Sequence, residues 1–424
     1  MNVPVSRRRY LRMVGVSGVA SLTGCSRTGK EGTGTDRSTP IGIPMFRYNP
    51  ARTGGPRGVT GPTDSVAEQS VVQIQGGIGY SLAVFDDTVY AGSNDGVLSA
   101  FATNAGTERW SVEVNGQIGW PPAVVDDTVY VSCGGGTICA LAASDGTERW
   151  RFETGKQVAP APAVVDGTLY VGGVGDGEGQ LYALDATDGT ERWSFEMGFN
   201  AYASPAVVDG TVYIGGKSAY ALDADDGTEQ WTHEFRYLDS ASPAVVDGTV
   251  YLGGSSAYAL DAVDGTEQWS HEFSYLDSAT PAVADGTVYL KHGKRAWALN
   301  AADGTEQWSF EPEDSTDTVG TGPLAVLNET VYIGGDDIVY ALAADGGAKQ
   351  WSFEVANSVG CSPAVTNDAV YLGGNNGAVY ALATSDGTEQ WRFEASSWVS
   401  SVVVVDGTVY AGTADGAIHA LTAE

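Results

Sequence analysis

A unit of about 40 residues recurs along this sequence, and a repeat of that length constrains the fold more than any other feature. Residues 204–231, SPAVVDGTVYIGGKSAYALDADDGTEQW, give one complete copy. Eight copies end in a Trp, at Trp110, Trp150, Trp193, Trp231, Trp269, Trp308, Trp351 and Trp391. Nine carry a Tyr preceded by Val or Leu, at Tyr90, Tyr130, Tyr170, Tyr213, Tyr251, Tyr289, Tyr332, Tyr371 and Tyr410. The chain is therefore an array of equivalent units.

Each copy has the pattern of four short β-strands. Residues 206–208 and 212–214 are β-branched or aromatic runs separated by Asp209–Gly210, a dipeptide that favours a tight hairpin turn. A third strand is expected over 219–222 and a fourth near Trp231. One such sheet cannot bury both of its faces, but sheets stacked around an axis cover one another. An indole wedged between two sheets buries roughly 150–250 Å², worth at most about 4–6 kcal/mol. The sequence predicts an all-β propeller of four-stranded blades.

The two ends of the array complement each other. Residues 67–74 align with the Trp-bearing strand of later units and have Ser70 at the Trp position, whereas the last unit stops after its third strand, 417–421. Pairing these two pieces would close the ring, so we expect a single propeller over residues 67–424. This count gives nine blades. Eight blades is the alternative, because propellers commonly have four to eight.

The N-terminal segment has the pattern of an export signal. Residues 6–12, SRRRYLR, contain a twin-arginine pair, residues 13–22 are weakly apolar, and residues 22–25, LTGC, resemble a lipobox. We expect residues 1–25 to be a twin-arginine lipoprotein signal with Cys25 as the lipid attachment site. A plain secretory signal with an incidental Cys is the alternative. Residues 26–66 are rich in Gly, Thr, Ser and Pro and are expected to be a flexible tether and lead-in.

The charge of the chain is strongly negative. It contains 53 Asp and Glu against 22 Lys and Arg, for a net charge of −31. Removing residues 1–25, which hold four Arg and no acidic residue, changes this to −35. Such a surface repels nucleic acid. It also predicts a halophilic prokaryote, because concentrated salt screens the self-repulsion within a few ångströms.

The spacing Ala221-x-Asp223-x-x-x-Gly227-x-x-x-Trp231 resembles the tryptophan-docking motif of the pyrroloquinoline-quinone (PQQ) type β-propellers. That superfamily contains quinoprotein alcohol dehydrogenases and the non-catalytic propeller lipoprotein of the bacterial outer-membrane assembly machinery. The Ala precedes all eight Trp residues, whereas the Asp occurs only as Asp185, Asp223 and Asp261. The resemblance implies the fold and leaves the activity open.

The residues that the resemblance would require of a dehydrogenase are missing. Those enzymes carry two adjacent Cys beside a metal-held quinone, and no two Cys are adjacent here. Cys133 and Cys139 flank a glycine turn, so they form either a hairpin disulfide or two buried thiols. The four His show no metal-ligand spacing, and the acidic turn 174–179 has two carboxylates where a protein Ca²⁺ cage needs six to eight oxygens. We expect no catalytic residue, no metal site, and neither PQQ nor Ca²⁺ as cofactor.

Aromatic and charged residues collect where the units differ most, between the Trp strand of one unit and the first strand of the next. A binding face would use such residues, although they could equally fill space around a wide channel. The candidate rim residues are Tyr80, Trp120, Tyr202, Arg236, Tyr237, Asp239, Tyr275, Asp277 and Trp398.

These observations predict a monomeric, non-catalytic scaffold for envelope proteins, held by Cys25 on the outer face of the cytoplasmic membrane. The first alternative is a PQQ-dependent or sugar oxidoreductase. The second is a propeller that binds a ligand such as a polysaccharide or a quinone.

Overall fold

A computed structural model describes residues 42–43 and 60–424 of the chain, without residues 104–105, 159–160, 176–178, 199–202, 236–241, 274–279, 293, 313–323, 336, 357, 360 and 362. Of residues 42, 43, 80 and 81 it describes the backbone alone.

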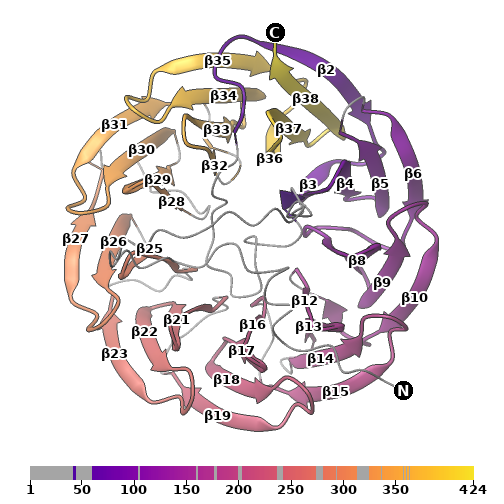
Figure 1. The fold of residues 1–424 in the computed structure, drawn as a ribbon, viewed down its shortest axis with the longest axis vertical. Coiled ribbons are helices and arrows are strands. Elements are labelled where there is room, and N and C mark those ends of the chain that lie inside the picture. The colour runs from indigo at the N-terminus through magenta and orange to yellow at the C-terminus, as the bar shows by residue number, and fades with distance from the viewer. Residues whose placement is uncertain are drawn as a thin grey trace, which may run out of the picture.

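The described residues form a β-propeller of nine four-stranded antiparallel blades around one axis, with no helix among them (Figure 1). The prediction of nine blades is confirmed. From blade 1 to blade 9, the innermost strands are β3 (Ile78–Phe85), β7 (Ala123–Val125), β12 (Ala163–Val165), β16 (Ala206–Val208), β20 (Ala244–Val246), β24 (Ala282–Ala284), β28 (Ala325–Leu327), β32 (Ala364–Val365) and β36 (Val399–Val405). The second strands are β4 (Thr88–Ser93), β8 (Thr128–Cys133), β13 (Thr168–Val174), β17 (Thr211–Ile214), β21 (Thr249–Gly253), β25 (Thr287–His292), β29 (Thr330–Gly334), β33 (Ala369–Gly373) and β37 (Thr408–Thr413).

The two outer layers follow the same order. The third strands are β5 (Val97–Ala102), β9 (Thr137–Ala142), β14 (Gln180–Asp185), β18 (Ser218–Asp223), β22 (Ser256–Asp261), β26 (Arg295–Asn300), β30 (Ile338–Ala343), β34 (Ala378–Ala383) and β38 (Ala417–Ala423). The outermost strands are β6 (Glu108–Glu113), β10 (Glu148–Glu153), β15 (Glu191–Glu196), β19 (Glu229–Glu234), β23 (Glu267–Glu272), β27 (Glu306–Phe310), β31 (Lys349–Glu354), β35 (Glu389–Glu394) and β2 (Val66–Gln73).

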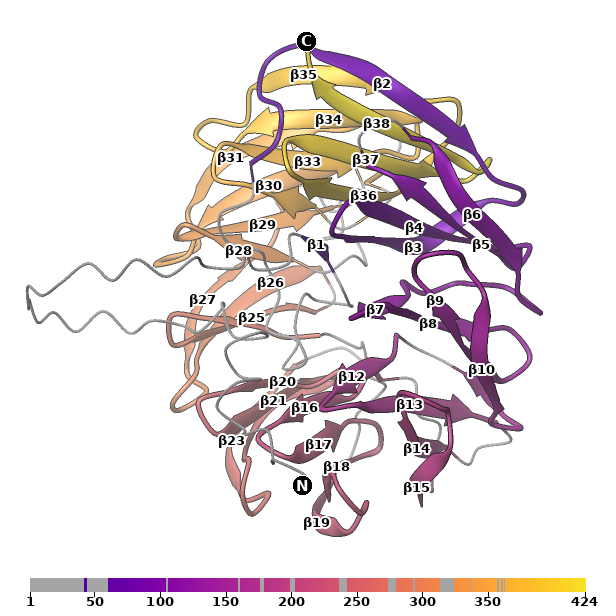
Figure 2. The same cartoon turned by 45° about the vertical axis from the view of Figure 1, so that its right-hand side comes forward.

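Two strands lie outside this scheme. β1 (Gly42–Ile43) pairs with β3 and so adds a fifth strand to blade 1 at its inner edge (Figure 2). β11 (Gln157–Val158) pairs with the end of β13 in blade 3. Residues 42–43 belong to the stretch that was expected to be a flexible tether.

Each Trp of the repeat joins its blade to the next one. Trp231, in the middle of blade 4's outer strand, donates from Nε1 to the carbonyl oxygen of Ala262 in blade 5, at 3.0 Å, and Tyr213 Oη donates to the same oxygen at 3.1 Å. Gly265, with φ of +71°, packs on this indole, and a Cβ there would lie 2.6 Å from Trp231 Cδ2. The burial and the Nε1 hydrogen bond recur at the other seven Trp residues, and a Gly packs in the same way on all of them except Trp391. The core is thus a ring of clusters between neighbouring blades.

The N-terminal strand completes the ring. β2 pairs with β38 along its length, from Val66 opposite Ala423 to Gln73 opposite Ala417. The carbonyl oxygen of Pro62 accepts hydrogen bonds from Trp391 Nε1 and Tyr371 Oη, both at 2.9 Å, and so takes the place of the turn residue, Ala or Thr, that accepts from the other Trp residues. A segment from the start of the chain therefore holds the last two blades.

Candidate functional site

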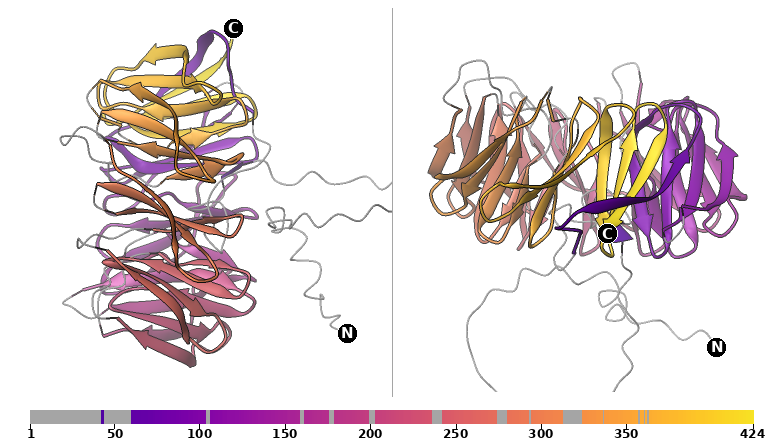
Figure 3. Two further views of the ribbon diagram at one scale, coloured as in Figure 1. Left: turned by 90° about the vertical axis from the view of Figure 1, so that its left-hand side faces the viewer. Right: turned by 90° about the horizontal axis from the view of Figure 1, so that it is seen from above.

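The propeller has two faces, and Figure 3 shows the disc between them from the side. Antiparallel neighbours send alternate connections to opposite sides of the disc. We call turn face the side with the turns between first and second strands, such as Asp209–Gly210, and between third and fourth strands, such as 224–228. We call loop face the opposite side, which has the turns between second and third strands and the connections between blades.

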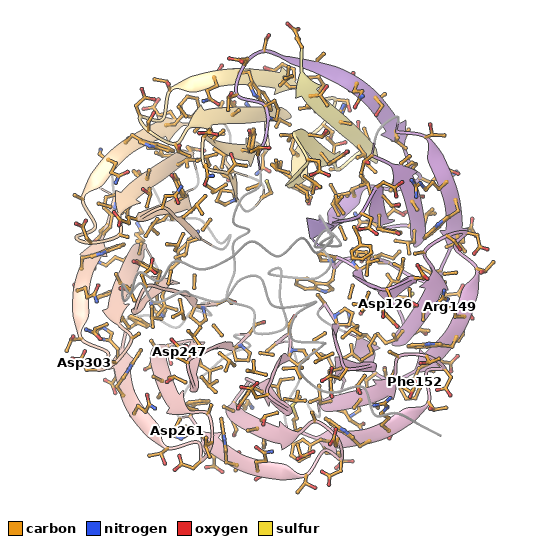
Figure 4. The ribbon with its side chains drawn as sticks, viewed as in Figure 1. Asp126, Arg149, Phe152, Asp247, Asp261 and Asp303 are labelled. Carbon is orange, nitrogen blue, oxygen red and sulfur yellow. The ribbon has the colours of Figure 1, made fainter. Side chains whose placement is uncertain are left out.

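Aspartates line the turn face at two radii. Asp126 and Asp247 belong to inner turns, and Asp261 and Asp303 to outer turns (Figure 4). The inner Asp residues occupy positive φ, for example 48° at Asp247, where a short polar side chain is tolerated. In the outer turns the carboxylate accepts from the Thr two residues later, as between Asp303 Oδ1 and Thr305 Oγ1 at 2.6 Å. Much of the acidity is thus built into turn geometry.

Of the candidate rim residues, the structure describes Trp120, Trp398 and the backbone of Tyr80, and these three belong to the loop face. Six residues and the side chain of Tyr80 lie outside the described part of the chain; the six are Tyr202, Arg236, Tyr237, Asp239, Tyr275 and Asp277. Trp120 and Trp398 are described and are 39% and 53% exposed. They are two of the four large apolar side chains that are exposed among the described residues, the others being Val71 and Val263.

Trp120 and Trp398 flank the first strand of blade 1. Ser400, two residues after Trp398, donates from Oγ to the carbonyl oxygen of Ile78 at 2.6 Å. The next residue, Gly79, lies against the carbonyl oxygen of Gly119, beside Trp120. The two indoles therefore come from neighbouring parts of the loop face, on either side of a backbone that has Gly at its surface.

Polar side chains next to these indoles come from the second-to-third turns of blades 1 and 9 and from the connections between blades. Gln117 Nε2 donates to Asn94 Oδ1 at 2.8 Å, and both side chains are exposed. Asp415 accepts from Ser396 Oγ and from Thr413 Oγ1, both at 2.6 Å. Burial acts to raise the pKa of Asp415, but these hydrogen bonds outweigh it and the pKa is lowered. The rim groups Asn94, Gln117 and Asp415 were not predicted from the sequence; the signal was that the turns at Asn94 and Asp415 depart from the Gly–Gly form of blade 4.

The three described cysteines are buried. Cys133 and Cys139 are free thiols whose sulfurs lie 3.3 Å apart, which corresponds to the second of the two alternatives. The contact with Cys139, together with burial, raises the pKa of Cys133. Burial raises the pKa of Cys361 to about 12. Cys25 lies outside the described residues.

The histidines lie between blades. His233 Nε2 is 3.6 Å from Glu267 of blade 5, and His271 packs on Phe273 and Trp297. His419 Nδ1 lies 2.5 Å from Glu68 Oε1 across the β38–β2 pair. They belong to a second aromatic layer above the Trp ring, typified by Phe195 and Tyr220, which the sequence analysis did not identify. The signal was the position two residues after each Trp, which is Phe in five units, His in two and Val in one.

The described side chains do not fit a metal-held quinone. No group of three or more His, Cys, Asp or Glu placed to bind a metal ion occurs in the described part of the chain. A hollow of about 60 Å³ lies on the turn face between blades 5 and 6, near Asp247 and Tyr251. Ligand pockets are usually roughly 300–1,000 Å³. Asp176 and Glu178 of the acidic turn lie outside the described residues. None of the described segments is a helix long and apolar enough to cross a membrane.

Comparison with known families gives matches along the whole repeat array. A family model described as outer membrane protein assembly factor BamB matches residues 59–173, 94–219, 158–258, 216–337 and 335–424. No curated protein sequence matches the chain.

Solved structures of two kinds are similar to this chain. BamB from Moraxella catarrhalis is 18% identical, with a TM-score of 0.59 over 84% of this chain and 100% of that one. A europium-containing methanol dehydrogenase is 14% identical, with a TM-score of 0.63 over 88% and 89%. Quinohemoprotein alcohol dehydrogenase from Comamonas testosteroni is 14% identical, with a TM-score of 0.62 over 90% and 80%. Similarity at these identities shows the fold alone.

Proposed function

Because the chain belongs to the family of the outer membrane protein assembly factor BamB, we propose that it is a non-catalytic scaffold that binds other proteins at the cell envelope. Its docking surface is the loop face around Trp120 and Trp398. The chain is held on the outer face of the cytoplasmic membrane of a halophilic prokaryote by a lipid on Cys25, after twin-arginine export.

The observation that carries this proposal is the pair of exposed indoles. Trp is enriched at the centres of protein interfaces, where it supplies much of the binding energy. The eight Trp residues of the repeat are all buried between blades, so Trp120 and Trp398 are outside the structural pattern. Their polar neighbours Asn94, Gln117 and Asp415 supply the hydrogen-bonding rim that surrounds such a centre.

Photo-cross-linking on intact cells tests the docking surface. A benzophenone amino acid would replace Trp398 or Trp120 in separate variants, with Val263, 82% exposed on the turn face, as the matched control. We expect one discrete protein adduct from the loop-face positions and none from position 263. Equal adducts from both faces, or none from the loop face, would contradict the proposal.

The competing reading is an oxidoreductase, since dehydrogenases share the fold. Titration of the purified protein with PQQ and Ca²⁺ distinguishes the two. The scaffold should give no saturable absorbance change, whereas a tight one-to-one change would replace our proposal with a quinoprotein.

A second candidate function is the binding of a neutral polysaccharide. The same indoles, with Gly79 and Gly119 between them and the Asn94–Gln117 amides beside them, provide stacking planes and hydrogen-bonding groups for sugar rings. Electrophoresis through gels containing soluble glucans would show retardation of the wild type, lost in Trp398→Ala and kept in Trp398→Phe. Unchanged mobility in every glucan would remove this candidate.

A further inference from the structure

The chain before the propeller is attached to the turn face. In the β1–β3 pair, Gly42 lies opposite Phe85 and Ile43 opposite Val84. Phe85 is the last residue of β3 and directly precedes the inner turn at Asp86. The backbone therefore arrives at Gly42 from the turn-face end of blade 1.

A second attachment lies on the same face. Gly407, in the inner turn of blade 9, donates its backbone N–H to the carbonyl oxygen of Thr60 at 3.1 Å. β2 then starts at Val66 opposite Ala423, at the turn-face end of β38. The two described attachments of the N-terminal region, at Gly42 and at Thr60, are both made at the turn face.

Because the tether is short, this attachment point restricts how the propeller can be oriented relative to the membrane. Sixteen residues separate Cys25 from Gly42. A flexible linker of that length has a root-mean-square span of roughly 20–24 Å and a limit of roughly 53–58 Å. To turn the disc over, the tether would have to pass four strands outward, roughly 15–20 Å, and then the height of a six-residue strand, roughly 20 Å. That path is roughly one and a half to two times the ordinary span, so an inverted disc would require a tether stretched well beyond its relaxed length.

We infer that the anchored propeller holds its turn face toward the membrane and presents the loop face, with Trp120 and Trp398, away from it. The partner is then a soluble protein, or a domain that stands clear of the bilayer, rather than a membrane-embedded one. This inference rests on the proposed function for the lipid at Cys25 and for the role of the loop face.

The negative charge of the turn face favours a position in which this face is held near the bilayer by the tether without contacting the lipid. Residues 60–424 hold 51 Asp and Glu and 12 Lys and Arg, a net charge of −39, and the inner and outer turns place many of these acids on that side. Anionic headgroups repel such a surface over about 10 Å at 0.1 M salt and about 3 Å at 1 M. The disc should therefore approach the bilayer as salt is added without turning over.

Energy transfer on liposomes tests the orientation with no partner present. Protein comprising residues 25–424 would be coupled through Cys25 to a maleimide lipid, because Cys133, Cys139 and Cys361 are buried. A donor dye would be attached through an azido amino acid at Val263 on the turn face or at Ser396 on the loop face. The acceptor is a headgroup-labelled lipid in phosphatidylcholine vesicles.

Transfer should be several-fold more efficient from position 263 than from position 396. Replacing Ile43 with Pro should reduce that ratio, because loss of the β1–β3 pairing lengthens the free tether to residue 59. Unchanged circular dichroism would show that this variant is folded. Equal transfer from both positions, or more from 396, would overturn the inference. Because no partner is involved, that result leaves the cross-linking test of the docking surface to be judged separately.

Discussion

The fit between one Trp and one Gly holds each pair of blades together. Gly265 is at φ of +71° and a Cβ would lie 2.6 Å from Trp231, whereas Gly248 is at φ of +76° with open space around a Cβ. Ala at either position pays the left-handed penalty of about 1–2 kcal/mol. Gly265→Ala should lower the free energy of unfolding by about a further 1–3 kcal/mol, because the added methyl group overpacks against the indole. Chemical denaturation of the two variants measures the difference.

The comparison isolates the contact because both glycines have the same backbone conformation and belong to turns on the same face. A similar loss of unfolding free energy in both variants would show that the indole moves aside at no cost. The contact between Trp and Gly would then not be what holds neighbouring blades together.

The outer-turn aspartates make the stability acid-sensitive. Hydrogen bonds from the Thr two residues later lower the pKa of Asp226, Asp264 and Asp303. Because these pKa values are lower in the folded chain than in the unfolded one, their contribution is complete above about pH 4 and is lost as the pH falls through the lowered values. Replacing all three with Asn keeps the acceptor oxygen and removes the titration. The Asn variant should lose less stability than the wild type between pH 5 and pH 2.

Thermal unfolding in 2 M KCl is the suitable measurement, because the salt screens the general self-repulsion. A charge-matched control replaces Glu108, Glu153 and Glu234 of the outer strands with Gln. If the Gln control reduces the loss of stability between pH 5 and pH 2 as much as the Asn variant does, the turn aspartates are not the cause of the acid sensitivity.

Among the elements, the strand that closes the ring is the one with a distinct task. β2 pairs with β38, and the residues just before it receive Trp391 and Tyr371. Ser70 stands where the other blades have Trp and lies under Gly106 of blade 1, so the ninth interface lacks an indole. Closure there depends more on β3 and β36, which are longer than the other innermost strands and are joined by the Ser400–Ile78 hydrogen bond.

Truncation should separate the role of β2 in closing the ring from the role of the preceding residues. A chain starting at residue 60 keeps β2 and should remain a monomeric propeller. A chain starting at residue 75 lacks β2 and leaves the edge of β38 unpaired, which favours strand pairing between molecules. We expect the shorter chain to oligomerise and to unfold at a lower temperature, as measured by light scattering and circular dichroism. A stable monomer starting at residue 75 would contradict the role assigned to β2.

The elements that could be predicted from the sequence are those whose residue pattern recurs from unit to unit. Strand alternation, the Asp–Gly turns and the Trp positions recur in copy after copy, so the nine blades and the pairing of 67–74 with the last unit could be derived before the structure. β1 could not, because a two-residue strand depends on the edge offered by Val84 and Phe85 rather than on its own residues. The rim groups Asn94, Gln117 and Asp415 were missed because the loops that carry them do not repeat. Which of these side chains lie close together depends on how neighbouring blades are placed.

The distribution of charge governs the behaviour of the whole molecule. A propeller with net charge −39 over residues 60–424 repels itself in dilute buffer, and the turn face gathers aspartates at two radii (Figure 4). Among the described residues, five Arg side chains are paired to acids, as Arg192 is to Asp185. Screening lengths fall from about 10 Å at 0.1 M salt to about 3 Å at 1 M. The unfolding temperature should therefore rise steeply between 0.1 M and 2 M KCl.

Two controls separate screening from the general strengthening of hydrophobic burial by solutes. Glycine betaine is zwitterionic and does not screen, so it should raise the unfolding temperature much less than KCl at equal osmolality. Replacing Asp126, Asp166, Asp209 and Asp247 with Asn keeps the turn geometry and lowers the charge, which should stabilise the protein at 0.1 M KCl and reduce the slope against salt. If betaine and KCl act equally and the Asn variant keeps the full slope, self-repulsion is not what limits the fold. The acidity would then need an explanation other than life in concentrated salt.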